Sequence, residues 1–275
     1  MIFQDSKNTV IRHNQHVLLN DIDFSNRIAK DIVRGKIHNQ YLYLQRINIK
    51  QEEKKYDEII CKFKKIRNTL EVAKDIEEIR GIEGFCSMLF FICYSSNFNC
   101  KWTSFNGRNK NPPKDPINAV LSFLYTVLAN KIHSFLIIEG LDASIGFLHT
   151  LSYGRTSLVY DLIEEYRTPI VESLTCSLFN LGVFNNTDFT DELTDDENWD
   201  TSKEEDNKTN KVGVYLTEVG MKKTLSHFEK KLMTEHKYEL KNKVLTYESI
   251  IHEQIKHYKK VLNGECAHYI PLEVV

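Results

Sequence analysis

Four polar side chains lie inside strongly apolar stretches of the sequence, where they could take part in chemistry. Glu83 lies in GIEGFCSMLFF, His149 follows SIGFL, and Asp161 and Glu164 lie in SLVYDLIEEYR. Because an isolated charge is costly to remove from water, such carboxylates must be paired, protonated or bound to a metal. The four residues are therefore candidates for a functional site.

Asp161 and Glu164 are three residues apart and share one helix face, whereas Glu165 is rotated by about 100° and is expected to meet solvent or a basic side chain. Two carboxylates and one imidazole suit Mg²⁺ or Mn²⁺, with coordination positions left for water and phosphate oxygens. A metal held in this way neutralises charge on a phosphate and activates a water or a 3′-hydroxyl. The chemistry indicated is phosphodiester cleavage or transfer.

Each residue also has an ordinary explanation. A glutamate such as Glu83 is favoured in the first turn of a helix. His149 could be a hydrogen-bonded core residue, and Asp161 and Glu164 could form a solvated helix face. No spacing rule connects these distant segments, so the residues alone leave the site open.

The elements that would position these residues are predicted to be mainly helical. Only 5 Pro and 11 Gly occur, too few for many short strands and turns. Residues 1–20 are polar with short β-like pieces, and Ser25 is a possible N-cap for the helix after them. A basic loop precedes Asp115 and Pro116, which signal a helix start. Helices are predicted at 24–47, roughly 50–74, 80–96 with Glu83 near its start, 117–141, 156–182 with a bend at Pro169, 217–236 and 245–264, and a short strand or extended entry at 212–216.

An acidic tract interrupts this array. Residues 188–206 hold ten of the 38 acidic residues and one of the 36 basic ones, so 28 acidic and 35 basic residues remain elsewhere. The rest of the chain is basic, which admits a polyanionic partner. We expect a disordered or loosely ordered loop at about 186–211 within a helical catalytic domain at 21–275, and a remnant or linker at 1–20.

Composition also excludes some classes of protein. No apolar run approaches the about 20 residues of a membrane span, and the start has no signal-peptide pattern. The six cysteines show no CxxC spacing, which favours reduced, structural thiols in a cytoplasmic protein.

Seven segments together resemble the CRISPR-associated integrase and endonuclease family of spacer acquisition (the Cas-one family). They occur in family order between about Gln15 and Pro271, and three of them contain the chemically unusual positions. The segments are IAKDIVRGKIHNQ, EIRGIEGFCSMLFF, FNGRNKNPPKDPINAVLSFLYTVL, GLDASIGFLHT, SLVYDLIEEYRTPIVESL, YLTEVGMKKTLSHFEKKL and VLNGECAHYIPL.

The resemblance implies a helical catalytic domain in which Glu83, His149 and Glu164 bind Mg²⁺ or Mn²⁺. Asp161 would be a close supporting or alternative acid. The implied reaction is attack by the 3′-hydroxyl of a captured DNA fragment on a phosphodiester of the CRISPR repeat. Tyr125 matches a family tyrosine and could position DNA or pack in the core.

The resemblance also implies partners, namely double-stranded DNA and the small Cas-two subunit. Arg108, Lys110 and Lys114 lie in a basic loop suited to phosphate contacts. Arg155 and Arg167 flank the ligand segments and could reach phosphate or pair with Glu165.

Several positions depart from the family pattern. The usual N-terminal β-rich domain is reduced to a short β-like remnant, so the family's homodimer is in question. The loop reads RNKNPP with fewer arginines, and Ala143 replaces a usual proline. Two hypotheses follow: an active metal-dependent integrase and nuclease, or a non-catalytic DNA-binding or scaffolding protein.

Overall fold

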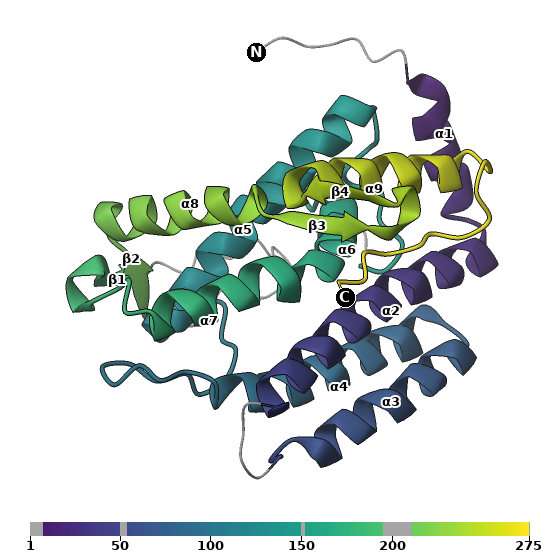
Figure 1. Cartoon of the computed structure of the whole chain (residues 1–275). Coiled ribbons are helices and arrows are strands. Elements are labelled where there is room, and N and C mark those ends of the chain that lie inside the picture. The colour runs from purple at the N-terminus through teal and green to yellow at the C-terminus, as the bar shows by residue number, and fades with distance from the viewer. Residues whose placement is uncertain (1–7, 50–53, 150–151, 195–210, 275) are drawn as a thin grey trace, which may run out of the picture.

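The two longest helices, α2 (Ile22–Ile49) and α5 (Pro116–Glu139), organise the fold (Figure 1). The structure is a computed structural model that describes residues 8–49, 54–149, 152–194 and 211–274. Helix α2 packs on α3 (Asp57–Val72), α4 (Ile76–Ser95) and α6 (Ser157–Tyr166), and α5 packs on α6, α8 (Glu218–Leu232) and α9 (Tyr247–Leu262). The prediction of a mainly helical protein is confirmed.

Helix α2 begins before the predicted cap. The Asp21 carboxylate accepts a hydrogen bond from the backbone N–H of Phe24 at 2.9 Å, so Ser25 lies inside the helix and the prediction of Ser25 as N-cap is wrong. An apolar stripe runs along the helix, because Ile28, Ile32 and Ile37 are buried. This stripe makes α2 the helix on which α3, α4 and α6 pack.

Helix α4 starts at Ile76, where the Asp75 side chain accepts from the backbone N–H of Glu78. Glu83 is therefore two turns inside the helix, and the prediction that it lies near the helix start is wrong. The dipole of a first turn does not explain its presence there.

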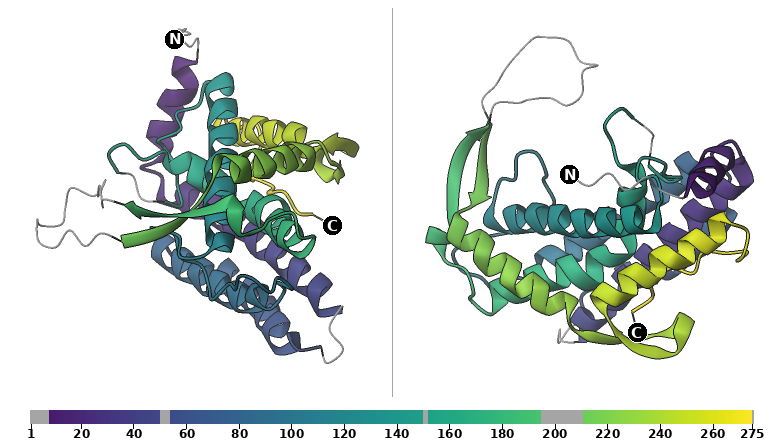
Figure 2. Two further views of the ribbon diagram at one scale, coloured as in Figure 1. Left: turned by 90° about the vertical axis from the view of Figure 1, so that its left-hand side faces the viewer. Right: turned by 90° about the horizontal axis from the view of Figure 1, so that it is seen from above.

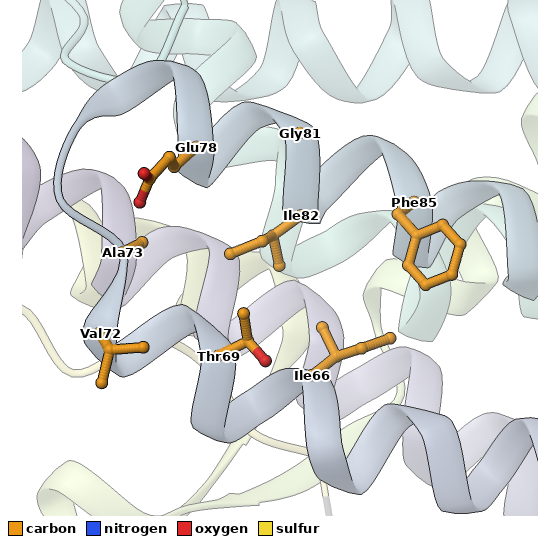
Figure 3. A pocket seen from close by; sticks show the side chains of 8 residues that line it. All are labelled: Ile66, Thr69, Val72, Ala73, Glu78, Gly81, Ile82 and Phe85. Atoms are coloured by element: carbon orange, nitrogen blue, oxygen red, sulfur yellow. The ribbon is translucent and has the colours of Figure 1, made fainter.

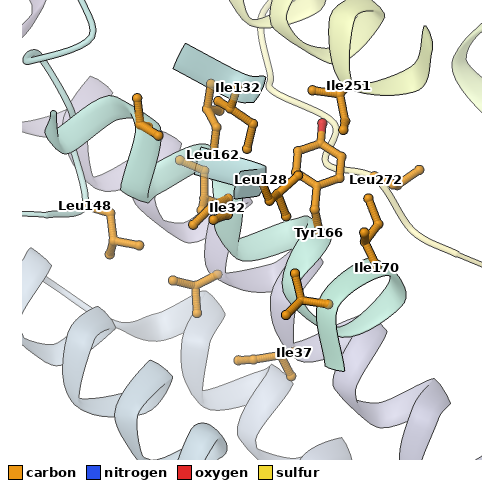
Figure 4. Packing of buried hydrophobic residues seen from close by; sticks show 14 of the residues in the cluster. Ile32, Ile37, Leu128, Ile132, Leu148, Leu162, Tyr166, Ile170, Ile251 and Leu272 are labelled. Atoms are coloured by element: carbon orange, nitrogen blue, oxygen red, sulfur yellow. The ribbon is translucent and has the colours of Figure 1, made fainter. Parts of the chain in front are cut away.

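Helix α5 starts as predicted, with Asp115 accepting from the backbone N–H of Asn118 at 2.8 Å and Pro116 at the first position. By length and composition alone α5 would also suit a membrane span, contrary to the sequence prediction. In the fold it is a core helix. Its Leu128 and Ile132 are fully buried and belong to the same cluster as Ile32 of α2 (Figure 4).

The predicted bend at Pro169 is a π-helical turn, η1 (Arg167–Glu172), between α6 and α7 (Ser173–Asn180). Proline lacks a backbone N–H and its ring clashes with the carbonyl four residues earlier. A wider turn accommodates both effects. The chain therefore continues through Pro169 as one uninterrupted helix, from α6 through η1 to α7, whose pitch changes locally.

The β-like start predicted for residues 1–20 is wrong over Thr9–Leu18, which form helix α1. Mainly polar contacts hold α1 in place. The Gln15 amide bonds both the N–H and the C=O of Asp142, at 2.8 and 3.1 Å, and Arg12 donates to the Gly140 carbonyl.

The ends of the predicted acidic loop are also ordered. Residues Asn186–Asp188 form a 3-10 turn, η2, and β1 (Phe189–Thr194) pairs with β2 (Lys211–Leu216) in an antiparallel hairpin that projects from the helices (Figure 2). The prediction of a loop is wrong there, whereas the strand at 212–216 is confirmed. Residues 195–210 of the tract lie outside the described residues.

A second hairpin between α8 and α9 was not predicted. It consists of β3 (Glu235–Tyr238), a 3-10 turn η3 (Glu239–Lys241) and β4 (Lys243–Thr246). Within the described part of the chain, the structure records no disulfide between cysteines.

Glu165 anchors the C-terminal tail, so the prediction that it meets solvent or a basic side chain is wrong. It is 1% exposed and accepts hydrogen bonds from the Tyr269 hydroxyl at 2.6 Å, from Gln254 at 3.2 Å and from the backbone N–H of Leu272 at 2.5 Å. Asn39 of α2 also donates to the Leu272 carbonyl. The tail is thereby fixed across α2 and α6.

The tail passes so close to α2 that Gly35 leaves no room for a side chain. A Cβ there would lie 2.5 Å from the Cβ of Pro271. We expect Gly35→Ala to lower the free energy of unfolding by about 1–3 kcal/mol, because overpacking outweighs the gain in helix propensity. Denaturant titration measures this change.

Gly81 of α4 provides the matched control. It lines an apolar groove of about 540 Å³ between α3 and α4, and nothing lies within 4 Å of its Cβ position (Figure 3). Gly81→Ala is expected to stabilise by about 0.5–1 kcal/mol through helix propensity alone. Equal effects of the two substitutions would contradict the proposed packing of the tail.

Candidate active site

A cavity of about 900 Å³ brings together side chains from α2, α4, α5, α6 and the loops before α5 and α6. Most of the predicted site residues line it, and only Asp161 and Lys114 do not. The predicted residues in the cavity wall are Glu83, Arg108, Lys110, Tyr125, His149, Arg155, Glu164 and Arg167. Segments that no spacing rule connects therefore converge on one space.

Lys36 of α2 connects the two candidate carboxylates. Its ammonium group forms ion pairs with Glu83 of α4 and with Glu164 of α6, the latter at 2.5 Å. The side chain of Lys36 is 4% exposed. Glu83 also accepts a hydrogen bond from the Ser87 hydroxyl at 2.9 Å. One buried cation thus holds two carboxylates from different helices together.

Sequence reasoning missed Lys36, although a signal was present. Ile28 and Ile32 form the buried stripe of α2, and Lys36 is the next residue at the same spacing of four. A lysine on an apolar helix face needs buried counter-charges. The two acidic residues already singled out provide them.

Glu164 is ionised in this setting. Burial alone would raise its pKa, but the positive charges of Arg167 and Lys36 lower the pKa to about 2. Arg167 donates to the other carboxylate oxygen of Glu164 at 3.0 Å. Burial by itself would lower the pKa of Lys36, yet Glu164 and Glu83 hold it above the ordinary value. The group is therefore a set of mutually compensated charges.

His149 is oriented by Asp161, which is fully buried behind the cavity wall. The carboxylate of Asp161 accepts three backbone N–H bonds, from Phe147 at 2.6 Å, Leu148 at 3.0 Å and His149 at 2.9 Å. Its Oδ1 also lies 2.8 Å from the His149 Nδ1. Because Nδ1 is engaged, Nε2 is the ring nitrogen available to a ligand.

The loop around His149 fits tightly on Asp161. A Cβ at Gly146 would lie 2.7 Å from Asp161 Oδ2. Arg80 of α4 adds a hydrogen bond to the Leu148 carbonyl at 2.7 Å. Asp161 thus supports the histidine from behind, so the geometry favours a positioning role over that of an alternative acid at the cavity.

Tyr125 is held among charged groups in the cavity wall. Its hydroxyl donates to Glu172 at 2.7 Å, and the Arg167 guanidinium lies 4.2 Å from its ring centroid. Burial and the nearby carboxylate raise the pKa of Tyr125, so the phenol is neutral. Tyr125 packs in the wall and also lines the cavity, and its role toward DNA stays a prediction.

The basic residues differ in how freely they could reach a phosphate. Arg108 fastens its loop to α5 through Asn118 at 2.8 Å and Ser122 at 3.0 Å. Lys110 and Arg155 are exposed at the cavity, and Arg155 lies 5.5 Å from the ring centroid of Tyr160. Lys114 is exposed outside the cavity wall. The expected pairing of Arg155 or Arg167 with Glu165 is wrong, because Glu165 faces the tail.

The chemistry of the donor set fits a hard divalent cation. Two carboxylates and an imidazole nitrogen suit Mg²⁺ or Mn²⁺, and a carboxylate behind a metal-binding histidine is a common arrangement. Among the described residues, no three His, Cys, Asp or Glu side chains are close enough to hold an ion as they stand. The Lys36 ammonium occupies the space between Glu83 and Glu164 and would have to shift.

Comparison with known proteins shows similarity along most of the chain. The family model of the CRISPR associated protein Cas1 matches residues 1–230. The CRISPR-associated endonuclease Cas1 3 of Thermus thermophilus is 30% identical over 269 residues, which cover 98% of this chain and 73% of the relative. The endonuclease Cas1 1 of Moorella thermoacetica is 28% identical over 272 residues, covering 97% and 74%.

Solved structures show the same fold. A casposase bound to an integration product aligns with a TM-score of 0.81 at 22% identity, covering 98% of this chain and 74% of that one. A Cas1 protein from Thermotoga maritima aligns with a TM-score of 0.74 at 20% identity, covering 94% and 70%. The matched sequence and the fold lead to one assignment: the chain belongs to the Cas1 family of CRISPR-associated proteins.

Proposed function

We propose that this chain is a divalent-metal-dependent DNA endonuclease and integrase of CRISPR adaptation. The observation that supports this most directly is the convergence of Glu83, His149 and Glu164 on one cavity whose wall carries basic residues. Relatives are named as endonucleases, and the resemblance of the motifs implied the same three ligands. Mg²⁺ or Mn²⁺ would supply Lewis acidity for displacement at phosphorus.

The chain's own residues would hold the ion and the substrate. Glu83 and Glu164 would bind the cation through carboxylate oxygens, and His149 through Nε2 while Asp161 fixes its ring. Lys110 and Arg155 at the cavity are placed to bind phosphate oxygens, as charged donors bind DNA without reading its sequence. Arg167 stabilises the ionised form of Glu164.

The proposed reaction is transesterification. The 3′-hydroxyl oxygen of a captured DNA fragment forms a bond to a phosphorus of the CRISPR repeat, and the bond from that phosphorus to its original 3′-oxygen breaks. The released repeat strand carries away a 3′-hydroxyl, so bonds balance without an external energy source. Attack by water in place of the 3′-hydroxyl gives cleavage.

The proposed partners are double-stranded DNA and a small Cas2 subunit. A similar fold occurs in a casposase bound to an integration product and in a Cas6-RT-Cas1–Cas2 complex, the latter with a TM-score of 0.81 at 22% identity, covering 100% of this chain and 28% of that one. A cytoplasmic location would follow from these partners. The homodimer stays a prediction.

A non-catalytic DNA-binding role is the second candidate. It is favoured by Lys36, which already supplies the counter-charge that a metal would give to Glu83 and Glu164. Such a protein would bind DNA with a steep salt dependence and give no metal-dependent product.

We expect Glu83→Gln and Glu164→Gln each to reduce DNA joining by at least about 100-fold, because each removes a proposed ligand. The assay measures joined product from a duplex with free 3′-hydroxyls and a repeat-containing plasmid in Mn²⁺ or Mg²⁺. Glu58→Gln, at an exposed glutamate of α3, is the matched control and should leave product unchanged. Undiminished joining in either ligand variant would defeat the site assignment.

Asp161→Asn tests the support of His149. The asparagine amide has only one acceptor oxygen, so it cannot accept hydrogen bonds from all three backbone N–H groups and from the His149 ring. Its own NH₂ group would face some of these donors, and we therefore expect lower thermal stability. We also expect Mn²⁺ affinity to fall by about 10–100-fold, as is usual for groups that orient a metal-binding histidine. Electron paramagnetic resonance of free Mn²⁺ measures the affinity. Wild-type affinity in this variant would exclude the positioning role.

Lys36→Met separates the two candidate functions. Without the ammonium group, Glu83 and Glu164 lose their shared cation, so we expect a lower melting temperature in EDTA. Added Mg²⁺ should then raise the melting temperature more than it does in the wild type, because an ion replaces the lost charge. Absence of any Mg²⁺ response in both proteins would instead favour the non-catalytic role.

A further inference from the structure

A second, smaller cavity of about 280 Å³ lies further along α2, where residues of six elements (α2, η1, α7, α8, β3 and α9) and of the C-terminal tail meet. From Lys36 in the first cavity, Asn39, Tyr43 and Arg46 follow at spacings of three and four residues and line this second cavity. Thr168, directly after Arg167 in η1, also lines this cavity. The two cavities are therefore neighbours along the same helix face.

The second cavity gathers positive charge. Arg46 of α2, Lys231 of α8 and His236 of β3 all line it, and among the described residues no aspartate or glutamate does. Within the described part of the chain, none of the three forms an ion pair with a carboxylate. The Lys231 ammonium lies 5.2 Å from the ring centroid of Tyr247, and the His236 ring lies 4.1 Å from it. The three basic groups thus share one space without a counter-charge.

The charges in this cavity change the pKa values of the basic side chains that line it. Burial and the nearby charge of Arg46 lower the pKa of Lys231. Burial, Lys231 and Arg46 lower the pKa of His236. An anion placed among them would relieve the repulsion and draw a proton onto the imidazole, so its binding is favoured.

An unpartnered buried hydroxyl points to a ligand independently of the charges. Thr168 is 2% exposed and lines the cavity, and its Oγ1 has no hydrogen-bond partner among the described residues. Threonine hydroxyls in helices ordinarily bond a carbonyl of the preceding turn. The hydroxyl oxygen itself is buried, so it would donate to a bound group after rotation of the side chain toward the cavity.

We propose that the cavity formed by Arg46, Lys231, His236 and Thr168 is a binding site for a phosphate group. A guanidinium, an ammonium, an imidazole and a hydroxyl supply donors from several directions, which matches a tetrahedral anion with several acceptor oxygens. The group belongs either to a free phosphate-bearing small molecule or to a DNA backbone that runs along α2 from the first cavity.

Inorganic phosphate is the first probe, titrated into the full chain at constant ionic strength. We expect a saturable rise in melting temperature, with shifts of the His236 ring signals in NMR spectra. Lys231→Met should abolish the saturable rise while leaving the melting temperature without phosphate equal or higher, since a repulsive charge is lost. Lys230→Met removes the same charge from an exposed neighbour on α8 and should respond as the wild type does. Equal responses of the two variants would overturn the site.

DNA is the second probe and distinguishes the sources of the phosphate. If the group belongs to a DNA backbone, Lys231→Met lowers duplex affinity several-fold more than Lys230→Met and reduces the salt slope by about 1. If it belongs to a free small molecule, the two variants bind DNA equally while still differing toward inorganic phosphate. The phosphate titration uses no DNA, so its outcome is independent of the proposed catalytic function.

Discussion

The site depends on the compensation of buried charge around Lys36. Two carboxylates from α4 and α6 approach each other inside the protein, and without a cation between them their repulsion and desolvation would oppose folding. The ammonium of Lys36 removes this conflict and ties three helices to one point. Arg167 completes the compensation on Glu164. The packing of α2 against α4 and α6 therefore also determines the geometry of the site.

The need to compensate buried charge also explains why the acidic residues of α6 have different roles. Asp161, Glu164 and Glu165 are all buried, yet each has a different set of partners. Asp161 satisfies the backbone of the His149 loop, Glu164 meets cations in the cavity, and Glu165 meets neutral donors of the tail. Helix α6 thus contacts the His149 loop, the first cavity and the C-terminal tail.

Much of the structure could be predicted from the sequence, namely most helix positions, the Asp115 cap and most residues of the first cavity. Helix positions and caps depend on local periodicity, and the cavity residues lie in motifs that occur in a recognisable order. Lys36 could have been found by asking why a charge continues the stripe of Ile28 and Ile32. Other features could not be predicted. The role of Glu165 depends on a tail about 100 residues away, and α1 is held by bonds between Gln15 and Asp142. Contacts between residues far apart in the sequence produce no periodic pattern in it.

The π-helical turn η1 has a consequence for how this region tolerates change. A π-turn holds one residue more than an α-turn, which rotates everything after it by about 100°. Arg167 faces the first cavity and Thr168 the second, while Glu172 reaches back to Tyr125. Deletion of a single residue here would restore regular α-helical pitch and change which residues of the segment face the two cavities. Both the length of this segment and the identities of Arg167 and Glu172 are therefore constrained by the contacts they make.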